Sequence, residues 1–76
     1  MKAMVHIMLR NGILDPQGEV VKHALGTLGF DGVENLRIGK FIELDLDDNV
    51  TEANIAEMCD KLLANTVMES YKIEML

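Results

Sequence analysis

The sequence has little cysteine: Cys59 is the only one among its 76 residues. A single cysteine cannot form an internal disulfide, and Cys59, His6 and His23 lack the paired spacing of a zinc site. A domain of this size buries only about 60% of the surface that its unfolded chain exposes. Small domains recover stability through disulfides, metals or association. We therefore expect no metal site, and we expect the chain to associate with other chains.

Aromatic and basic residues are also scarce. The aromatic residues Phe30, Phe41 and Tyr71 are too few for a surface on which bases stack. Thirteen acidic residues outnumber seven basic ones, which gives a net charge of −6. Phosphate backbones and anionic lipids repel such a chain. We therefore expect neither nucleic acid nor a membrane as a partner.

Long apolar runs are absent, so no segment is predicted to span a bilayer. The N-terminal stretch is interrupted by His6 too early for a secretory signal. One free cysteine without a signal is typical of a protein in the reducing cytosol. We expect one cytoplasmic domain over residues 1–76.

What the sequence does contain is a clear succession of strand and helix patterns. Residues 2–9 alternate as in a strand, with Met4, His6 and Met8 on the face opposite the more apolar one. Asp15 and Pro16 predict the start of a helix, and Gly29 predicts its end. A core-facing stripe at helical spacing lies between them: Val21, Ala24, Leu25 and Leu28.

The stretch from 33 to 47 is extended but permits two arrangements. A three-residue loop at 38–40 would make a hairpin in which Leu36 pairs with Ile42, with the apolar residues on one face. Alternatively, one long strand bends at Gly39 and its far half projects toward a partner. Periodicity alone does not separate the two.

A second helix is predicted after Thr51, a favourable N-cap, with Asn65 near its end. Its apolar stripe comprises Ile55, Met58, Cys59, Leu62 and Leu63. A last strand is predicted over 68–76.

These elements predict an α+β fold: a two-layer sandwich with two helices on one face of a three- to four-stranded antiparallel sheet. The ferredoxin-like βαββαβ arrangement, or a close relative, has this form. The other sheet face would remain uncovered, and we expect it to mediate self-association into a homodimer or tetramer. The residues expected on this face are Met4, His6, Met8 and Phe41.

No catalytic constellation is evident. His6 and His23 lack a positioned partner, and Cys59 lies between apolar positions, where a thiol stays protonated. An acidic run also lacks the loop of a cation site and is interpreted as a solvated or interface edge. That run comprises Glu43, Asp45, Asp47 and Asp48.

Arg37 and Lys40 flank Gly39 in an otherwise acidic chain. They either keep a hairpin tip soluble or pair with acidic groups on a larger subunit, for which the planar arginine fork is well suited. We name both as candidate partner contacts.

Several segments together resemble the PurS family, the small subunit of phosphoribosylformylglycinamidine synthase. They are the Gly-Ile-Leu-Asp-Pro-Gln-Gly run at 12–18, Ala24-Leu25, residues 28–30, Gly32-Val33, and residues 36–44 with their Arg-x-Gly-Lys core. The likeness extends over the whole chain in length and order of elements.

The resemblance implies a role in purine biosynthesis without catalysis by this chain. A glutaminase subunit releases ammonia, and a large ATP-dependent synthetase subunit receives it. The small subunit bridges them, and ATP, magnesium and glutamine are used by those partners, with no cofactor in this chain. Two other classes remain open: a regulatory domain that senses a small molecule, and a small acyl-phosphate hydrolase using Arg10.

Overall fold

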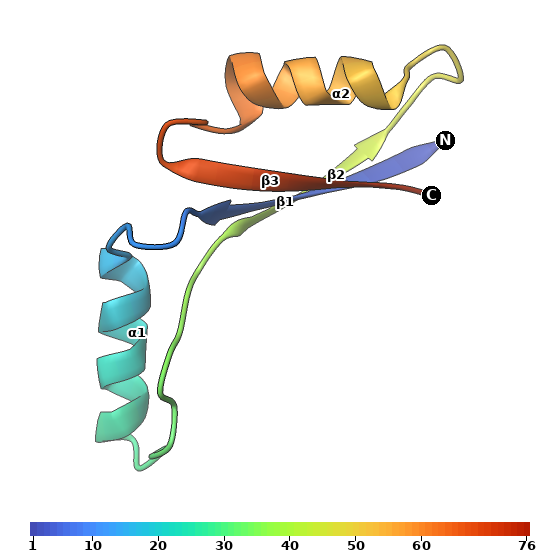
Figure 1. Ribbon diagram of the computed structural model, residues 1–76. Helices are drawn as coiled ribbons and strands as arrows, with labels where there is room; N and C mark the ends of the chain where they lie inside the picture. Colours follow the sequence, from blue (N-terminus) through green and yellow to red (C-terminus); the bar gives the residue numbers. More distant parts are fainter.

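The computed structural model describes all residues, 1–76, and is built around a three-stranded antiparallel sheet (Figure 1). The strands are β1 (Lys2–Leu9), β2 (Lys40–Asp45) and β3 (Glu69–Met75), in the order β2-β1-β3. The predicted α+β class is confirmed, in its three-stranded form. The strand at 2–9 has the predicted bounds, and the last strand differs by one residue at each end.

The register of the sheet places most of the apolar side chains of its three strands on one face. Val5 lies opposite Ile42 on β2 and Ile73 on β3. The inward side chains of β1 (Ala3, Val5 and Ile7) are completely buried. This face of the sheet is the core of the domain.

Helix α2 (Glu52–Met58) covers this face, and a π-helical turn, η1 (Cys59–Leu63), extends it (Figure 1). The predicted N-cap is confirmed: Thr51 Oγ1 accepts a hydrogen bond from Asn54 N–H, and Asn54 Oδ1 accepts one from Thr51 N–H. Ile55 and Cys59 are buried against β1.

The predicted stripe of this helix is wrong at Leu62 and at Met58, which is 37% exposed. Leu62 is 83% exposed, whereas Ile55 and Cys59 are buried. A π-helical turn has wider hydrogen-bonded rings than an α-helix, so it changes the angular spacing of the side chains that follow. Leu62 is therefore turned away from the sheet.

Helix α1 (Pro16–Thr27) begins and ends as predicted, with Asp15 as N-cap and Gly29 in the left-handed region at φ +92°. Its position differs from the prediction that both helices lie on one sheet face. Figure 1 shows α1 beyond the end of the sheet, roughly across the strand direction. Gly18 is its only fully buried residue, and Leu25 is the only member of the predicted core stripe that is even half-buried, so most of the stripe is exposed.

The path of the chain at Gly39 explains why α1 lies away from the sheet. Residues 33–39 are extended but pair with no strand, so there is no hairpin, and the bent extended segment is the arrangement observed. A Cβ at Gly39 would collide with the Ile7 carbonyl oxygen and the Met8 sulfur. Only glycine at position 39 allows the chain to come this close to Ile7 and Met8 of β1. With α1 beyond the end of the sheet, the molecule is elongated, with dimensions of 49 × 24 × 14 Å.

None of the helices is both long enough and apolar enough to cross a membrane.

Candidate assembly site

Exposed apolar side chains gather on the arm, which we define as residues 14–38: α1, its N-cap and the extended return segment. Four large apolar side chains of the arm are more than 60% exposed: Leu14, Val20, Leu28 and Phe30. Exposed apolar surface gathered in one element is typical of an interaction site. The arm therefore has the character of a binding element rather than of a self-contained packing unit.

The two ends of the arm are joined by Asp15. Its Oδ1 accepts a hydrogen bond from Gly18 N–H at 2.9 Å, which caps α1, and its Oδ2 accepts one from Ile38 N–H at 2.8 Å. The hydrogen bond from Ile38 contributes most, and that from Gly18 next, to holding the pKa of the Asp15 carboxyl below its ordinary value. Asp15 thus links the start of the helix to the end of the return segment.

Arg37 also holds the base of the arm, and we call the contacts made there by Asp15, Arg37 and Arg10 the joint. Its Nη2 donates to the carbonyl oxygens of Leu9, Arg10 and Ile13, at 3.1, 3.2 and 3.4 Å. Arg10 in turn donates to the Thr66 carbonyl oxygen from Nε and Nη2. Two arginine side chains therefore fasten the base of the arm to the end of the sheet.

The joint brings together two segments that are far apart in the sequence, 12–18 and 36–40. A Cβ at Gly18 would lie 2.8 Å from the Leu36 carbonyl oxygen, so only glycine allows this approach. The Asp-Pro-Gln-Gly and Arg-x-Gly-Lys patterns therefore have a structural explanation, since together they set the direction of the arm.

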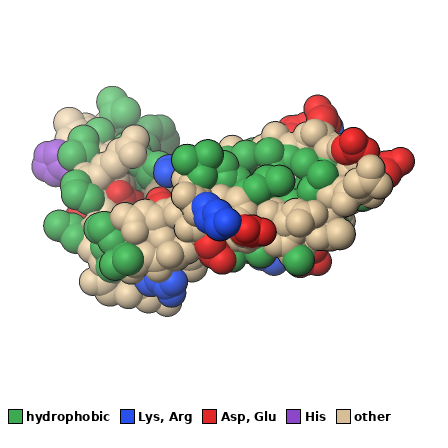
Figure 2. Space-filling model, turned by 90° about the horizontal axis from the view of Figure 1, so that it is seen from above, with side chains coloured by type: hydrophobic (Ala, Val, Ile, Leu, Met, Phe, Trp, Pro, Cys, Tyr) green, Lys and Arg blue, Asp and Glu red, His purple; other side chains and the backbone are tan.

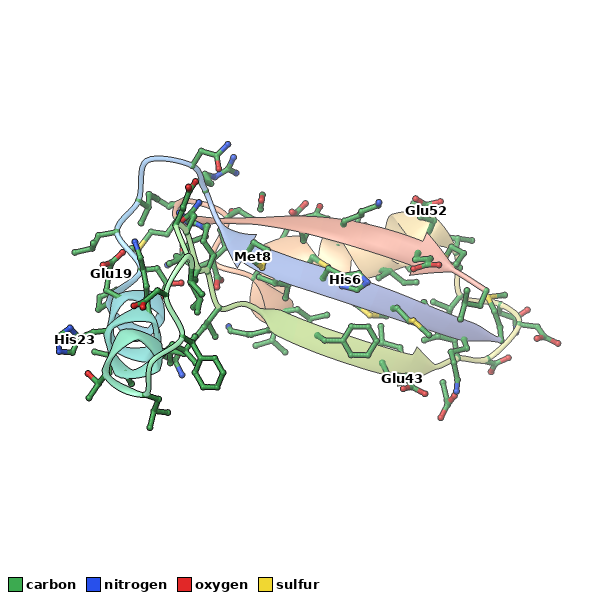
Figure 3. The ribbon with its side chains drawn as sticks, turned by 90° about the horizontal axis from the view of Figure 1, so that it is seen from below. His6, Met8, Glu19, His23, Glu43 and Glu52 are labelled. Carbon is green, nitrogen blue, oxygen red and sulfur yellow. The ribbon has the colours of Figure 1, made fainter.

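The second exposed surface is the sheet face opposite α2. His6 and Met8 lie on this face (Figure 3). His6 is paired with Phe41 across β1 and β2, with ring centroids 5.0 Å apart at 63°. Phe41 is 54% exposed. The four residues expected on an uncovered face, which include Met4, thus lie on one face, although its role in self-association stays a prediction.

Arg37 and Lys40 do not flank a hairpin tip. Lys40 is exposed and lies 3.7 Å from the Glu69 carboxylate, whereas Arg37 is half-buried in the joint. The two side chains therefore have different surroundings, and their contact with a partner stays a prediction.

The remaining titratable residues are dispersed. His23 lies on α1, far from His6 on β1 (Figure 3). Burial, and secondarily the Asp60 charge, raises the pKa of the Cys59 thiol, which lowers its reactivity. Acidic side chains gather at the end of the molecule remote from α1 (Figure 2). No group of histidine, cysteine and acidic residues has the arrangement of a metal site.

Sequence reasoning missed the exposure of the arm. The stripe on α1 was visible, but an apolar helical stripe predicts burial without indicating which chain buries it. The alternative of a long strand that bends at Gly39 and projects toward a partner was the one signal in the sequence that could have indicated an exposed arm.

An α+β domain with an apolar arm and a second uncovered sheet face defines a class of protein: small subunits that act by association. The family model of PurS, phosphoribosylformylglycinamidine (FGAM) synthase, matches residues 2–76. The chain belongs to the PurS family and is a non-catalytic subunit of that ligase of purine biosynthesis. The regulatory and hydrolase alternatives are thereby set aside.

Individual PurS proteins are similar to this chain in sequence and in structure. The chain is 49% identical to the PurS subunit of Mycobacterium leprae over 72 residues, covering 95% of this chain and 91% of the relative. The crystal structure of Bacillus subtilis PurS is similar with a TM-score of 0.89 at 44% identity, covering 96% and 94%. A chain of the PurLQS structure from Thermotoga maritima matches with a TM-score of 0.85 at 29% identity, covering 99% and 95%.

Proposed function

We propose that this chain holds a glutaminase subunit and a large ATP-dependent synthetase subunit together, so that ammonia passes between them without loss to water. The arm carries this proposal, because four of its large apolar side chains are more than 60% exposed in the single chain. The similar chain in the PurLQS structure supports it. Holding reaction partners in register is itself a large catalytic contribution. ATP, magnesium and glutamine are then used by the partners, in the cytoplasm.

Self-association is part of the proposal, and two features favour an exchange of arms between two copies. β2 is an edge strand whose outer backbone groups are unpaired, and residues 33–38 are extended without a partner strand. Two copies related by a two-fold axis at Gly39 would pair 33–38 of each chain with β2 of the other. Leu36 would then lie opposite Ile42 of the second copy, in the register considered above for a hairpin.

The same exchange would give α1 a surface to cover. α2 packs against β3, whereas Ile42 and Leu44 on β2 remain partly exposed on the core face. The stripe of α1 from the second copy would cover them, which would restore two helices on one sheet face. Domain exchange of this kind uses contacts already favoured by the sequence. The uncovered face with Phe41 would be free for a dimer of dimers or for a larger subunit.

Lys40 is the more accessible of the two candidate partner contacts. We propose that it pairs with an acidic group on a larger subunit, and that Arg37 assists mainly by fixing the joint beside it. An exposed lysine can form such a contact without loss of an internal hydrogen bond.

Reconstitution tests the assembly role. Glutamine-dependent synthesis by the two larger subunits is measured with and without this chain, together with the sedimentation of the isolated chain. The proposal expects activity only when the chain is added, and a dimer or tetramer by sedimentation. Full glutamine-dependent activity without the chain would refute the bridging role, and a folded monomer at micromolar concentration would refute self-association.

A further inference from the structure

A hollow of about 420 Å³ lies beside the joint, where β1 ends and β3 begins. Its polar lining consists of Arg10, Asn11, Arg37 and Ser70. All four side chains can donate hydrogen bonds. No acidic side chain lines it, although acidic residues outnumber basic ones in the chain by thirteen to seven.

Neither guanidinium group forms an ion pair, although the Arg37 charge contributes, after the hydrogen bonds, to lowering the pKa of Asp15. The three ion pairs of the protein all use lysine: Lys2–Glu43, Lys40–Glu69 and Lys61–Glu57. Arg10 and Arg37 donate only to backbone carbonyl oxygens. Arg10 Nη1 and Arg37 Nε and Nη1 make no hydrogen bond within the protein. The fold thus orients both cations and leaves donors on each unused.

The nearest acidic groups are already engaged. Glu69 accepts a hydrogen bond from Asn65 N–H and lies near Lys40, and its side chain is only 15% exposed. Asp15 is occupied by the N–H groups of Gly18 and Ile38. A locally positive hollow therefore persists in a chain of net charge −6.

We propose that this hollow binds one phosphate group of a small phosphorylated molecule. A phosphate monoester carries about −1.5 to −2 charges at pH 7, which matches two guanidinium groups better than the single charge of a carboxylate. Arginine forks bind phosphate oxygens through paired, charge-assisted hydrogen bonds. The Asn11 amide and the Ser70 hydroxyl add neutral donors. A single phosphate group avoids the repulsion that the acidic surface exerts on a polyanion.

The test is a titration of the full-length protein with inorganic phosphate, followed by the NMR signals of backbone amides and arginine Nε–H groups. Sodium chloride at matched ionic strength and sodium acetate are titrated in parallel. The proposal expects saturable shifts at Arg10, Asn11, Arg37 and Ser70 with phosphate, and at least tenfold weaker binding of acetate. Phosphate shifts no larger than those with chloride would overturn it, and acetate binding as tight as phosphate would assign the hollow to carboxylates instead.

A matched pair of variants localises the binding. Asn11→Asp adds a carboxylate to the hollow, and the Asn11 side chain makes no hydrogen bond on which the fold depends. Asn49→Asp adds the same charge in the exposed turn between β2 and α2. We expect at least tenfold weaker phosphate binding in Asn11→Asp, little change in Asn49→Asp, and unchanged melting temperatures in both. Equal affinity in the two variants would overturn the site.

Discussion

The Asp15 carboxylate accepts a hydrogen bond from the backbone N–H of Ile38 at 2.8 Å, across 23 positions of sequence. The same carboxylate caps α1. One side chain therefore determines both where the helix begins and where the return segment meets it. If the arm mediates assembly, its direction depends on this residue.

Asp15→Asn should weaken the joint while leaving a helix cap. The N–H groups of Gly18 and Ile38 point at different carboxylate oxygens, and asparagine replaces one of these oxygens with an NH2 group that donates, so one of the two hydrogen bonds is lost. We expect a melting temperature several degrees lower and weaker capture of the larger subunits. Asp31→Asn, an exposed acid in the arm, is the control. If the two variants behave alike, the joint does not have this role.

The stability of the protein should depend on the protonation of Asp15 in acid. Hydrogen bonds from Ile38 and Gly18 lower its folded-state pKa below the ordinary 3.8. Its contribution is therefore fully present above that ordinary value and is lost as the pH falls through the lower, folded value. Melting curves from pH 6 to about pH 2 should show a smaller acid-induced loss in Asp15→Asn than in Asp31→Asn. Identical pH profiles would contradict the assignment.

Glycine replacements should distinguish a crowded site from an open one. Gly39→Ala would force a Cβ against the Ile7 carbonyl oxygen, and overpacking of this kind costs about 1–3 kcal/mol. Gly26→Ala meets nothing within 4 Å and should stabilise by up to about 1 kcal/mol. Urea denaturation of both variants measures the difference. A stable Gly39→Ala protein would show that β2 can shift away from β1 at low cost.

Arm exchange predicts a covalent link between copies. Leu36→Cys with Ile42→Cys, in a Cys59→Ala background, should form disulfide-linked dimers under mild oxidation, because paired positions on adjacent strands have nearby Cβ atoms. Leu36→Cys with Glu43→Cys is the control, since Glu43 lies on the opposite sheet face. Gel electrophoresis without reductant reads the result. A monomeric intrachain disulfide would support a hairpin, and equal dimer yields from both pairs would contradict the proposed register.

Charge reversal at Lys40 should affect assembly but not folding. The Lys40–Glu69 pair is exposed on the lysine side, and such pairs contribute about 0–1 kcal/mol. We expect Lys40→Glu to retain nearly its full melting temperature but to bind the larger subunits at least tenfold more weakly. Lys61→Glu, on the surface of η1, should bind normally. Normal capture of both variants would show that Lys40 only increases solubility.

Much of the local structure was predictable. Alternation over residues 2–9 gave β1, and Asp15, Pro16 and Gly29 gave the ends of α1, because caps and strand alternation depend on neighbours within a few positions. The four residues of the uncovered sheet face followed from the same parity. Leu62 was mispredicted because no local signal separates a π-helical turn from an α-helical one.

The sequence by itself determined the elements, their apolar faces and the family. Only the tertiary structure decided the direction of the chain at Gly39, and with it the exposure of the arm. Leu36 can face Ile42 through a hairpin or across two copies, and the parity of the side chains is identical in both. The choice depends on long-range contacts, namely the Asp15–Ile38 hydrogen bond and the passage of Gly39 over Ile7. These join residues far apart in the sequence, so they have no signature in local periodicity.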